Sequence, residues 1–354
     1  MPQIAVLPGD GIGVDITREA VRVLGAVRPD VTCVEAPVGG AALEQGLPPL
    51  PEATRELAAR SEAILFGAVG LPKYDGMPMA QRPEAALFAL RSGFRLYANL
   101  RPVRVFPGLE AASSLRPELV RGLDLVVVRE LTGGIYFGKK ETWMEDGVEV
   151  ASDLMLYRAP EIERIVRTGF ELARKRRKHL TSVDKENVLD TSRLWRRVVE
   201  RIASEYPEVR LEHLLVDNAA MQLVRRPADF DVIVTENMFG DILSDEAAIV
   251  TGSIGTLPSA SLGEGGASGK QFGMYEPIGG TAPDIAGKGT ANPTAAILSA
   301  AMLLRHSLDD ETNAARIERA VEAAYASGKR TADVAAGAPA LSTTAFTDAV
   351  MLRL

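Results

Sequence analysis

Short apolar runs alternate along the chain with longer segments of helical periodicity. Runs rich in apolar residues predict strands at residues 4–7, 63–66, 123–128, 180–183, 210–216 and 230–234, of which 63–66 and 230–234 should be buried. Apolar residues at helical spacing predict a helix running to about residue 27, and further helices at 82–91, 160–176, 218–225, 240–250, 294–304, 310–326 and 343–354. Strand and helix alternate throughout, which is typical of an α/β protein.

The first strand leads into a glycine-rich turn, P-G-D-G-I-G at residues 8–13. Its spacing is G-x-G-x-G, whereas dinucleotide-binding Rossmann domains carry G-x-G-x-x-G followed by an acid that binds the ribose. Glu35, near the end of the next strand, could stand in for that acid. A single glycine-rich turn is nevertheless weak evidence, so the sequence disfavours an ordinary Rossmann nucleotide site.

A β-hairpin arm is predicted within residues 131–157. Asp146-Gly147 lies between the alternating runs 141–144 and 148–151, and Asp-Gly is a strong signal for a two-residue turn. Because an isolated hairpin is marginally stable in water, we expect its partner to lie on another subunit. Just before the hairpin, Tyr136 stands among glycines, which favours an approachable hydroxyl over a core position.

A second glycine-rich stretch, residues 262–275, has no periodicity, and we expect it to be mobile. It leads into residues 276–289, E-P-I-G-G-T-A-P-D-I-A-G-K-G. Backbone amides unhindered by side chains can approach a phosphate or a ribose closely. The prolines in this segment argue against a long disordered loop.

Two carboxylates fall on one face of the helix predicted at residues 240–250. Asp241 and Asp245 are spaced i,i+4, opposite the apolar positions of that helix. Like charges at this spacing repel by a few tenths of a kcal/mol on an isolated helix. The pair is therefore either a solvated face, in which Asp in a first turn also suits the helix dipole, or a cation site.

Several basic residues lie at the ends of predicted elements. Arg91, Arg101 and Arg129 would bind a dicarboxylate if their guanidinium forks met in one pocket, although each could instead be a surface arginine. Lys185 follows a strand and stands among acids, where a plain ion pair is the alternative to a catalytic role. Asp217 ends another strand and could act as the N-cap of the next helix.

Composition narrows the functional class. The chain has 354 residues, 46% of them hydrophobic, which is long enough for two domains. A net charge of −7 does not favour nucleic acid or an anionic membrane as a partner. A lone cysteine, Cys33, excludes an internal disulfide and fits a reducing cytoplasm. The first residues enter a strand directly, so we expect no signal peptide, and the apolar helix at 294–304 is too short to span a membrane.

Seven sequence blocks together resemble the β-decarboxylating dehydrogenases, the isopropylmalate/isocitrate dehydrogenase family. They are L-P-G-D-G-I-G at 7–13, R-P-E at 82–84, A-N-L-R-P at 98–102, V-R-E-L-T-G-G-I-Y-F-G at 128–138, S-V-D-K-x-N-V-L at 182–189, N-M-F-G-D-I-L-S-D at 237–245 and G-T-A-P-D-I-A-G-K-G at 280–289. The resemblance covers nearly the whole chain. It implies a two-domain open α/β fold rather than a standard Rossmann fold, with one domain at 1–97 plus 251–354 and the other at 98–250. It also implies a homodimer whose active sites are shared between subunits.

The resemblance implies oxidative decarboxylation of 3-isopropylmalate with NAD and Mg²⁺ or Mn²⁺, a step of leucine biosynthesis in the cytoplasm. Arg91, Arg101 and Arg129 would bind the substrate carboxylates, and Asp241 and Asp245, with Asp217 of the other subunit, would bind the metal. Lys185 of that subunit would be the base and Tyr136 the proton donor. The substrate-binding set also includes Glu84, Asp217 and Leu87, the last at the position that contacts the isopropyl group.

Cofactor contacts are implied mainly in the segment after the second glycine-rich stretch. The residues are Ile12, Glu276, Gly279, Gly280, Thr281, Ala282, Pro283, Asp284, Ile285 and Asn292. Asp284 would accept from the ribose 2′-hydroxyl of NAD and repel the 2′-phosphate of NADP. The sequence departs from some relatives at Gly279, where they place a histidine beside the adenine, and in the loop before residue 275.

Two other interpretations compete with this one. A sister dehydrogenase acting on homoisocitrate, tartrate or malate would share the arginines and the acids. A catalytically inactive nucleotide-binding or regulatory subunit is the alternative from another class, and the presence of Tyr136, Lys185 and all the candidate metal ligands argues against it.

Overall fold

The computed structural model describes residues 1–265 and 269–354, which form two compact units. Unit 1 comprises Met1–Leu96, Arg104–Gly122 and Ala248–Leu354, and unit 2 comprises Tyr97–Val103 and Leu123–Ala247. These bounds differ from the division expected from the sequence mainly at residues 104–122. That segment packs within unit 1, where the Ser113 hydroxyl donates to the Val250 carbonyl at 2.6 Å.

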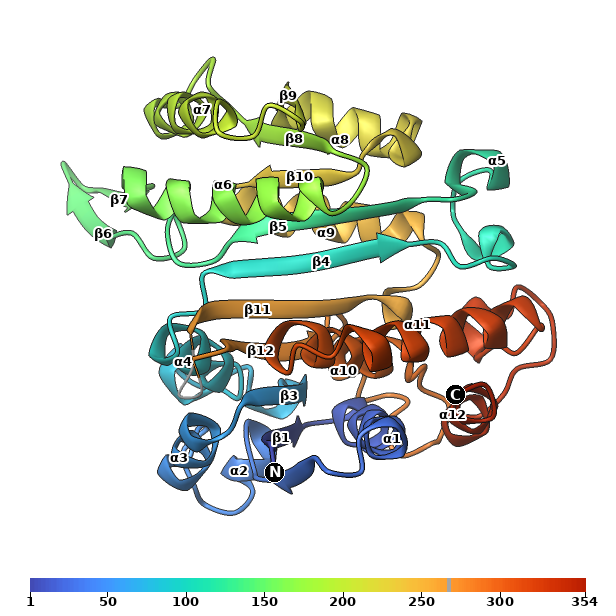
Figure 1. Ribbon diagram of the computed structural model, residues 1–354. Coiled ribbons are helices and arrows are strands. Elements are labelled where there is room, and N and C mark those ends of the chain that lie inside the picture. The colour runs from blue at the N-terminus through green and yellow to red at the C-terminus, as the bar shows by residue number, and fades with distance from the viewer. Residues whose placement is uncertain (266–268) are drawn as a thin grey trace. The chain divides into compact units, whose positions relative to one another are not determined.

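Unit 1 is built on a sheet with the strand order β2-β1-β3-β12-β11. Its strands are β1 (Gln3–Gly9), β2 (Thr32–Glu35), β3 (Ala63–Ala68), β11 (Pro258–Gly265) and β12 (Gln271–Pro277). Neighbours pair in parallel except β11 and β12, which are antiparallel. Its helices are α1 (Ile12–Val27), α2 (Gly40–Leu43), α3 (Glu52–Arg60), α4 (Ala85–Gly93), α5 (Pro117–Val120), α10 (Thr294–Ser307), α11 (Glu311–Ala326) and α12 (Thr343–Met351) (Figure 1).

The core of unit 1 is centred on α10. Every residue at positions 294–304 is buried, as the sequence predicted for this apolar segment. The helix packs against α1, α11 and β12, so its whole circumference faces protein rather than water. A helix that is apolar on all sides is stable only in such a position. No helix in the described parts of the chain is long and apolar enough to cross a membrane.

The second glycine-rich stretch was wrongly predicted to lack regular structure. Its described flanks belong to β11 and β12, with Leu262 opposite Gly273 and a register shift before the pair Gly265 and Gln271. Strand pairing depends on backbone hydrogen bonds, which glycine makes as well as any residue, so the absence of side-chain periodicity hid both strands. The expectation of mobility at residues 266–268 lies outside the described residues.

Unit 2 contains strands in the order β4-β5-β10-β8-β9. These are β4 (Ala98–Arg104), β5 (Asp124–Glu130), β8 (His179–Asp184), β9 (Arg210–Leu215) and β10 (Val232–Thr235). Its helices are α6 (Ala159–Arg174), α7 (Asp190–Ala203), α8 (Val216–Arg225) and α9 (Asn237–Val250), the last of which runs on into unit 1. Strands β5, β10, β8 and β9 are parallel, so their carboxyl ends reach the same edge of the sheet. Residues that follow these strands are thereby gathered, although they are far apart in sequence.

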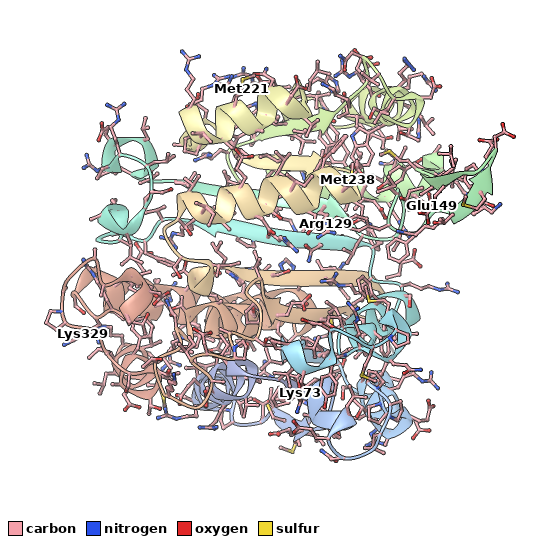
Figure 2. All side chains as sticks on the ribbon, turned by 180° about the vertical axis from the view of Figure 1, so that it is seen from behind. Lys73, Arg129, Glu149, Met221, Met238 and Lys329 are labelled. Atoms are coloured by element: carbon pink, nitrogen blue, oxygen red, sulfur yellow. The ribbon has the colours of Figure 1, made fainter. Side chains whose placement is uncertain are left out.

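The predicted hairpin is present as β6 (Lys140–Glu145) and β7 (Val148–Asp153), paired antiparallel. Asp146 and Gly147 have φ angles of 50° and 80°, as a tight two-residue hairpin turn requires. Nearly all of its side chains are exposed, and Figure 2 shows Glu149 on this projecting arm. The prediction that another subunit covers the arm stays a prediction.

Candidate active site

Helix α9 presents Asp241 and Asp245 one turn apart, as the sequence predicted. Phe239, Leu243 and Ala247 are buried on the opposite side, whereas the two carboxylates are 34% and 64% exposed. The helix begins at Asn237, three residues earlier than expected. Asp241 therefore lies in the second turn, and the expected first-turn interaction with the helix dipole was wrong. The N-terminal amides are bound instead by the buried Glu236 carboxyl, which accepts from the Phe239 amide at 2.7 Å.

Two of the predicted arginines converge on these carboxylates. Arg101 on β4 places Nη1 3.1 Å from Asp245 Oδ1 and Nη2 3.7 Å from Asp241 Oδ1. Arg129 on β5 forms an ion pair with Asp241, and Figure 2 shows it beside α9. Gly240 makes room for it, because a Cβ there would lie 2.6 Å from the Cγ of Arg129. Both arginines are almost fully buried, so their charges act in a region of reduced solvent screening.

Tyr136 reaches the same carboxylate from the loop that follows β5. Its hydroxyl donates to Asp241 Oδ2 at 2.9 Å, and the Arg129 guanidinium lies 5.7 Å from its ring centroid. Burial, followed by the hydrogen bond to Asp241, raises the pKa of Tyr136 above its ordinary value. The phenol therefore keeps its proton at neutral pH, as a proton donor must.

The loop that carries Tyr136 is fixed at its base by Glu130. This buried carboxylate accepts from the amides of Thr132 and Gly133 at 3.0 and 2.7 Å. Glycine is required next, since a Cβ on Gly133 would lie 2.6 Å from the ring of Tyr157. The loop therefore packs directly on the Tyr157 ring.

Lys185 and Asp217 form a separate pair at the ends of β8 and β9. The Lys185 Nζ lies 2.6 Å from Asp217 Oδ1. The hydrogen bond from Lys185 is the largest influence on the Asp217 carboxyl and holds its pKa below the usual range. The expectation that Asp217 caps α8 was wrong, because the helix already begins at Val216 and its N-cap is Leu215. The Asp217 side chain is thus left facing Lys185 rather than the helix amides.

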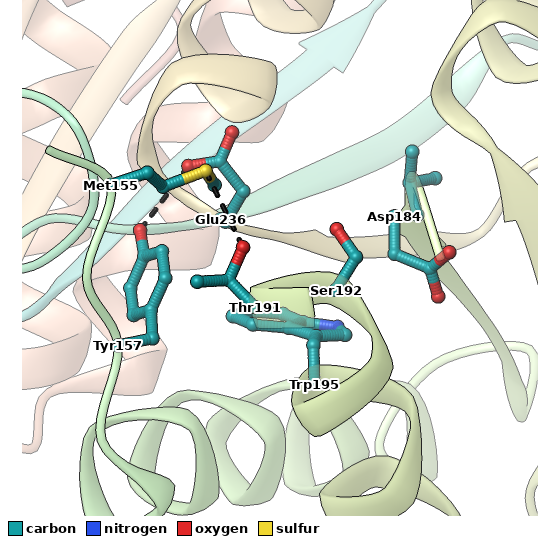
Figure 3. Close-up of a pocket in the computed structure, with 8 residues that line it drawn as sticks. Met155, Tyr157, Asp184, Thr191, Ser192, Trp195 and Glu236 are labelled. Atoms are coloured by element: carbon teal, nitrogen blue, oxygen red, sulfur yellow. Dashed lines mark hydrogen bonds between the residues drawn. The ribbon is translucent and has the colours of Figure 1, made fainter. Parts of the chain in front are cut away.

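A small pocket lies behind this sheet edge in unit 2 and contains none of the predicted site residues. Figure 3 shows it between Tyr157, Trp195 and Glu236. The Tyr157 hydroxyl donates to Glu236 Oε2 at 3.2 Å. Burial raises the pKa of Glu236, and likewise that of Glu130. The pocket also touches the base of the lysine loop, because the Lys185 amide donates to Ser192 at 3.1 Å.

Arg91, the third predicted arginine, belongs to unit 1 and is held by Glu276. Its Nη2 lies 2.9 Å from Glu276 Oε1, and both side chains are largely buried. Leu87 stands one turn earlier on the same helix, α4, and is half-buried. Glu84, the N-cap residue of α4, points Oε1 towards Gly70, where an added Cβ would lie 2.6 Å away. Glu84 Oε2 and Arg91 Nε are buried without a hydrogen bond within the described residues.

The predicted cofactor segment lies against the first glycine-rich turn. The Ile12 amide donates to the Thr281 carbonyl at 2.8 Å. Gly11 is needed there, because it has a φ of 56° and a Cβ would lie 2.1 Å from that carbonyl oxygen. Beyond this contact the chain turns at Ala282, with Asp284 exposed. Gly279, Gly280, Pro283 and Ile285 also lie at least partly open to solvent.

Asn292 stands apart from the other predicted cofactor residues. Its side chain accepts from the amide of Thr294, the first residue of α10, at 3.0 Å, while Nδ2 donates to Asp333 at 3.0 Å. This bonding gives Asn292 an evident structural role. A contact between Asn292 and the cofactor stays a prediction.

The carboxylates of α9 suit a hard divalent cation. Mg²⁺ and Mn²⁺ prefer carboxylate oxygens, and Asp241 and Asp245 offer them on one exposed face beside a cluster of polar groups. Among residues 1–265 and 269–354, no three His, Cys, Asp or Glu side chains gather closely enough to hold a metal ion. One chain therefore supplies two of the three predicted ligands together, and Asp217 is engaged with Lys185.

Three polar residues of this site escaped the sequence analysis. Ser244 accepts from Arg101 Nη1 at 2.6 Å, while Asn99 and Asn237 accept from the Nε atoms of Arg101 and Arg129. Asn99 could have been found, since residues two apart on a strand share a face. Asn237 could not, because its partner is 108 residues away in the sequence.

Comparison with known proteins agrees with this geometry. The family model described as isocitrate/isopropylmalate dehydrogenase matches residues 3–350. The chain is 56% identical to a 3-isopropylmalate dehydrogenase of Bordetella avium, covering 99% of both chains. It is 54% identical to one of Halalkalibacterium halodurans, covering 99% of this chain and 96% of the relative.

Solved structures of related dehydrogenases have the same fold. The isocitrate dehydrogenase of Methylococcus capsulatus matches with a TM-score of 0.87 and 35% identity, covering 100% of this chain and 99% of that one. A β-decarboxylating dehydrogenase from Thermococcus kodakarensis matches with a TM-score of 0.82 and 36% identity, covering 100% and 96%. The expected fold class is thereby confirmed.

Proposed function

The chain belongs to the isocitrate/isopropylmalate dehydrogenase family, and we propose that it is a 3-isopropylmalate dehydrogenase of leucine biosynthesis. The reaction is the oxidative decarboxylation of (2R,3S)-3-isopropylmalate to 4-methyl-2-oxopentanoate. The observation that carries this assignment is the 56% identity to a relative of that name over 99% of both chains. It is supported by the contact of Arg101, Arg129 and Tyr136 with the two carboxylates of α9.

The arginines bind and orient the substrate. A guanidinium fork matches a carboxylate with two parallel hydrogen bonds, and each charge-assisted bond contributes about 1.5 to 3 kcal/mol. Arg101 and Arg129 are already held at one place by α9, so little side-chain freedom is lost on binding. Arg91, a residue of unit 1, would also bind a carboxylate of the substrate. Leu87 would face the isopropyl group.

Asp241 and Asp245, together with Asp217 of a second copy, would hold a Mg²⁺ or Mn²⁺ ion. The ion would act as a Lewis acid towards the substrate oxygens. Lys185 of that copy would accept the proton of the C2 hydroxyl. NAD would take the hydride from C2. After the carboxylate on C3 leaves as CO₂, Tyr136 would donate its phenolic proton to C3.

The shared active site requires a homodimer. One supporting observation is that Asp217 pairs with Lys185, and that no three metal-ligating side chains gather within the described residues of one chain. The other is the exposed hairpin arm. A dimer in which each copy lends this pair to its neighbour accounts for both features. Gel filtration with light scattering tests the dimer, and mixing Lys185→Met with Asp241→Asn chains tests the sharing. Mixed dimers would regain about one working site in two, a result that independent sites cannot produce.

NAD is the proposed cofactor, and the cytoplasm is the proposed compartment. Asp284 would accept from the ribose 2′-hydroxyl, and its negative charge would repel a 2′-phosphate. The exposed position of Asp284 beside the Ile12 and Thr281 contact supports this assignment.

The choice of substrate is tested by comparing kcat/KM for 3-isopropylmalate, homoisocitrate, tartrate and malate with NAD and Mg²⁺. An apolar pocket discriminates by about 1 to 3 kcal/mol per methylene, so 3-isopropylmalate should exceed malate by about 100-fold or more. A higher kcat/KM for any of the other acids would assign the chain to a sister activity.

A further inference from the structure

Two buried asparagines each accept a hydrogen bond from the Nε atom of one of the two arginines that contact α9. The Nε of Arg101 donates to Asn99 Oδ1 at 2.9 Å, and the Nε of Arg129 donates to Asn237 Oδ1 at 3.0 Å. Both asparagines are 0% exposed. The same contact thus occurs on two arginines that come from different strands, β4 and β5.

A bond at Nε fixes the direction of the rest of the guanidinium. The group is planar, with its five donors in a rigid fork, so holding Nε–H aims both Nη atoms. Here they are aimed at α9, where Arg101 meets Ser244 and Asp245 and Arg129 meets Asp241. Without the asparagines, rotation about the side-chain bonds could turn the forks away from a bound carboxylate.

Asn237 makes a second connection, to the loop that carries Tyr136. Its Nδ2 donates to the carbonyl of Gly133 at 3.1 Å, at the start of the loop that carries Tyr136. Its backbone amide donates to the hydroxyl of Tyr157, which packs beneath the same glycine. One amide side chain therefore ties the fork of Arg129 to the loop of Tyr136.

The two hydrogen bonds at position 237 explain why the residue there is asparagine. The site needs an acceptor for a charged Nε–H and a donor for a carbonyl on one short planar group. Aspartate offers the acceptor only, and alanine offers neither. A buried charged donor left without its acceptor costs more than an ordinary hydrogen bond contributes.

We propose that Asn99 and Asn237 are positioning residues for the dehydrogenase reaction, each orienting one substrate-binding arginine, and that Asn237 also couples Arg129 to the loop of Tyr136. This inference rests on the proposed function. It predicts a division of labour, in which Asn99 affects substrate binding and Asn237 affects binding and turnover together.

The first experiment compares Asn99→Ala with Asn237→Ala in steady-state kinetics. We expect both to raise the KM for 3-isopropylmalate by about tenfold, because each removes the hydrogen bond that orients one substrate-binding guanidinium group. Only Asn237→Ala should also lower kcat, by about tenfold, as expected for a displaced proton donor. The matched control is Ser182→Ala, which removes the buried bond from Trp195 Nε1 at 3.1 Å in the same unit without touching either arginine.

The aspartate variants separate the two bonds of Asn237. Asn237→Asp retains the acceptor for Arg129 but sets an oxygen against the Gly133 carbonyl. It should leave KM within about threefold of the wild type and still lower kcat. Asn99→Asp retains the acceptor for Arg101 and should raise the KM less than Asn99→Ala does.

A double-mutant cycle of Asn237→Ala with Arg129→Lys measures whether the effect of Asn237 on KM depends on Arg129. Lysine has no Nε–H at that place, so the KM effect of Asn237→Ala should largely disappear in the Arg129→Lys background. KM effects that simply multiply would overturn the proposal, as would kinetics for Asn237→Ala that match Ser182→Ala. If Asn237→Ala does not fold, Asn237→Ser serves in the same cycle.

A substrate-free measurement separates this inference from the proposed function. In arginine-labelled protein, the Nε–H resonance of Arg129 is identified by its loss in Arg129→Lys. It should be protected from exchange in the wild type and exposed in Asn237→Ala. Failure of the wild type to turn over 3-isopropylmalate would reject the function while leaving this result intact, whereas unchanged exchange would reject the positioning role alone.

Discussion

The ammonium group of Lys185 lies 2.6 Å from the carboxylate of Asp217, at the ends of two neighbouring parallel strands. The pair joins the proposed base to the proposed third metal ligand. Lysine beside a carboxylate is an ordinary ion pair on many surfaces, and this one is only partly buried. What distinguishes it is its position at the sheet edge where Arg129 and Glu236 also emerge.

Replacement of Lys185 tests the assignment of the base. Lys185→Met should lower kcat by about 10²- to 10⁴-fold, the usual contribution of a positioned acid or base. The KM for 3-isopropylmalate should change much less. Lys270→Met is the control, because Lys270 makes a comparable surface ion pair with Asp309. Turnover of Lys185→Met equal to that of the control would revive a regulatory, non-catalytic role for the chain.

Metal dependence tests the carboxylates of α9. Exhaustive chelation should abolish turnover, and Mg²⁺ or Mn²⁺ should restore it. Asp245→Asn should weaken Mn²⁺ binding, measured directly by titration, by about tenfold or more, since it removes one charged ligand. Asp229→Asn, an exposed acid of the same unit, should bind Mn²⁺ as the wild type does. Equal Mn²⁺ affinities of the two variants would exclude Asp245 as a ligand.

Cofactor choice depends on the charge at position 284. The double change Asp284→Lys with Ile285→Tyr should lower kcat/KM for NAD and raise it for NADP. Each shift should be about tenfold or more, because a charge-assisted bond to the ribose is exchanged for one to a phosphate. Asp309→Lys makes the same charge change away from this loop and should alter neither value. Unchanged NAD kinetics in the double variant would reject the role of Asp284.

The buried carboxyl of Glu236 should make stability depend on pH. Burial raises its pKa in the folded state, so the folded chain keeps the proton to higher pH than the unfolded chain does. The stabilising contribution of the neutral carboxyl is complete below the unfolded pKa, and the free energy of unfolding falls as pH rises through the folded pKa.

Glu236→Gln keeps the side chain neutral, and its free energy of unfolding in urea should decline less as pH rises above the ordinary glutamate pKa. The control is Glu118→Gln, which changes an exposed carboxyl and should retain the slope of the wild type. A decline in Glu236→Gln as steep as in the control would show that another group is responsible.

Local rules of chain geometry let the sequence alone determine several features. Asp241 and Asp245 share a face because a helix turns every 3.6 residues, whatever surrounds it. The Asp146-Gly147 turn defines the hairpin because few dipeptides adopt two successive positive φ angles. The segment at 294–304 carries no charged residue and is largely apolar, so it had to be buried. The seven motifs, taken together, led to the family and hence to the fold.

Tertiary structure decided which distant residues meet. Arg129 and Asn237 are 108 positions apart, and only the pairing of β5 with β10 brings them together. The helix start at Asn237 is the exception, because it is fixed locally by the Glu236 carboxyl, which accepts from the Phe239 amide three residues on; glutamate is not among the preferred N-cap residues, so the sequence did not signal it. By contrast, β11 and β12 exist because their backbones bond to each other across a glycine-rich stretch without a side-chain pattern. Sequence periodicity records the face that a residue presents, whereas a contact partner is selected by packing and long-range hydrogen bonds that no local pattern encodes.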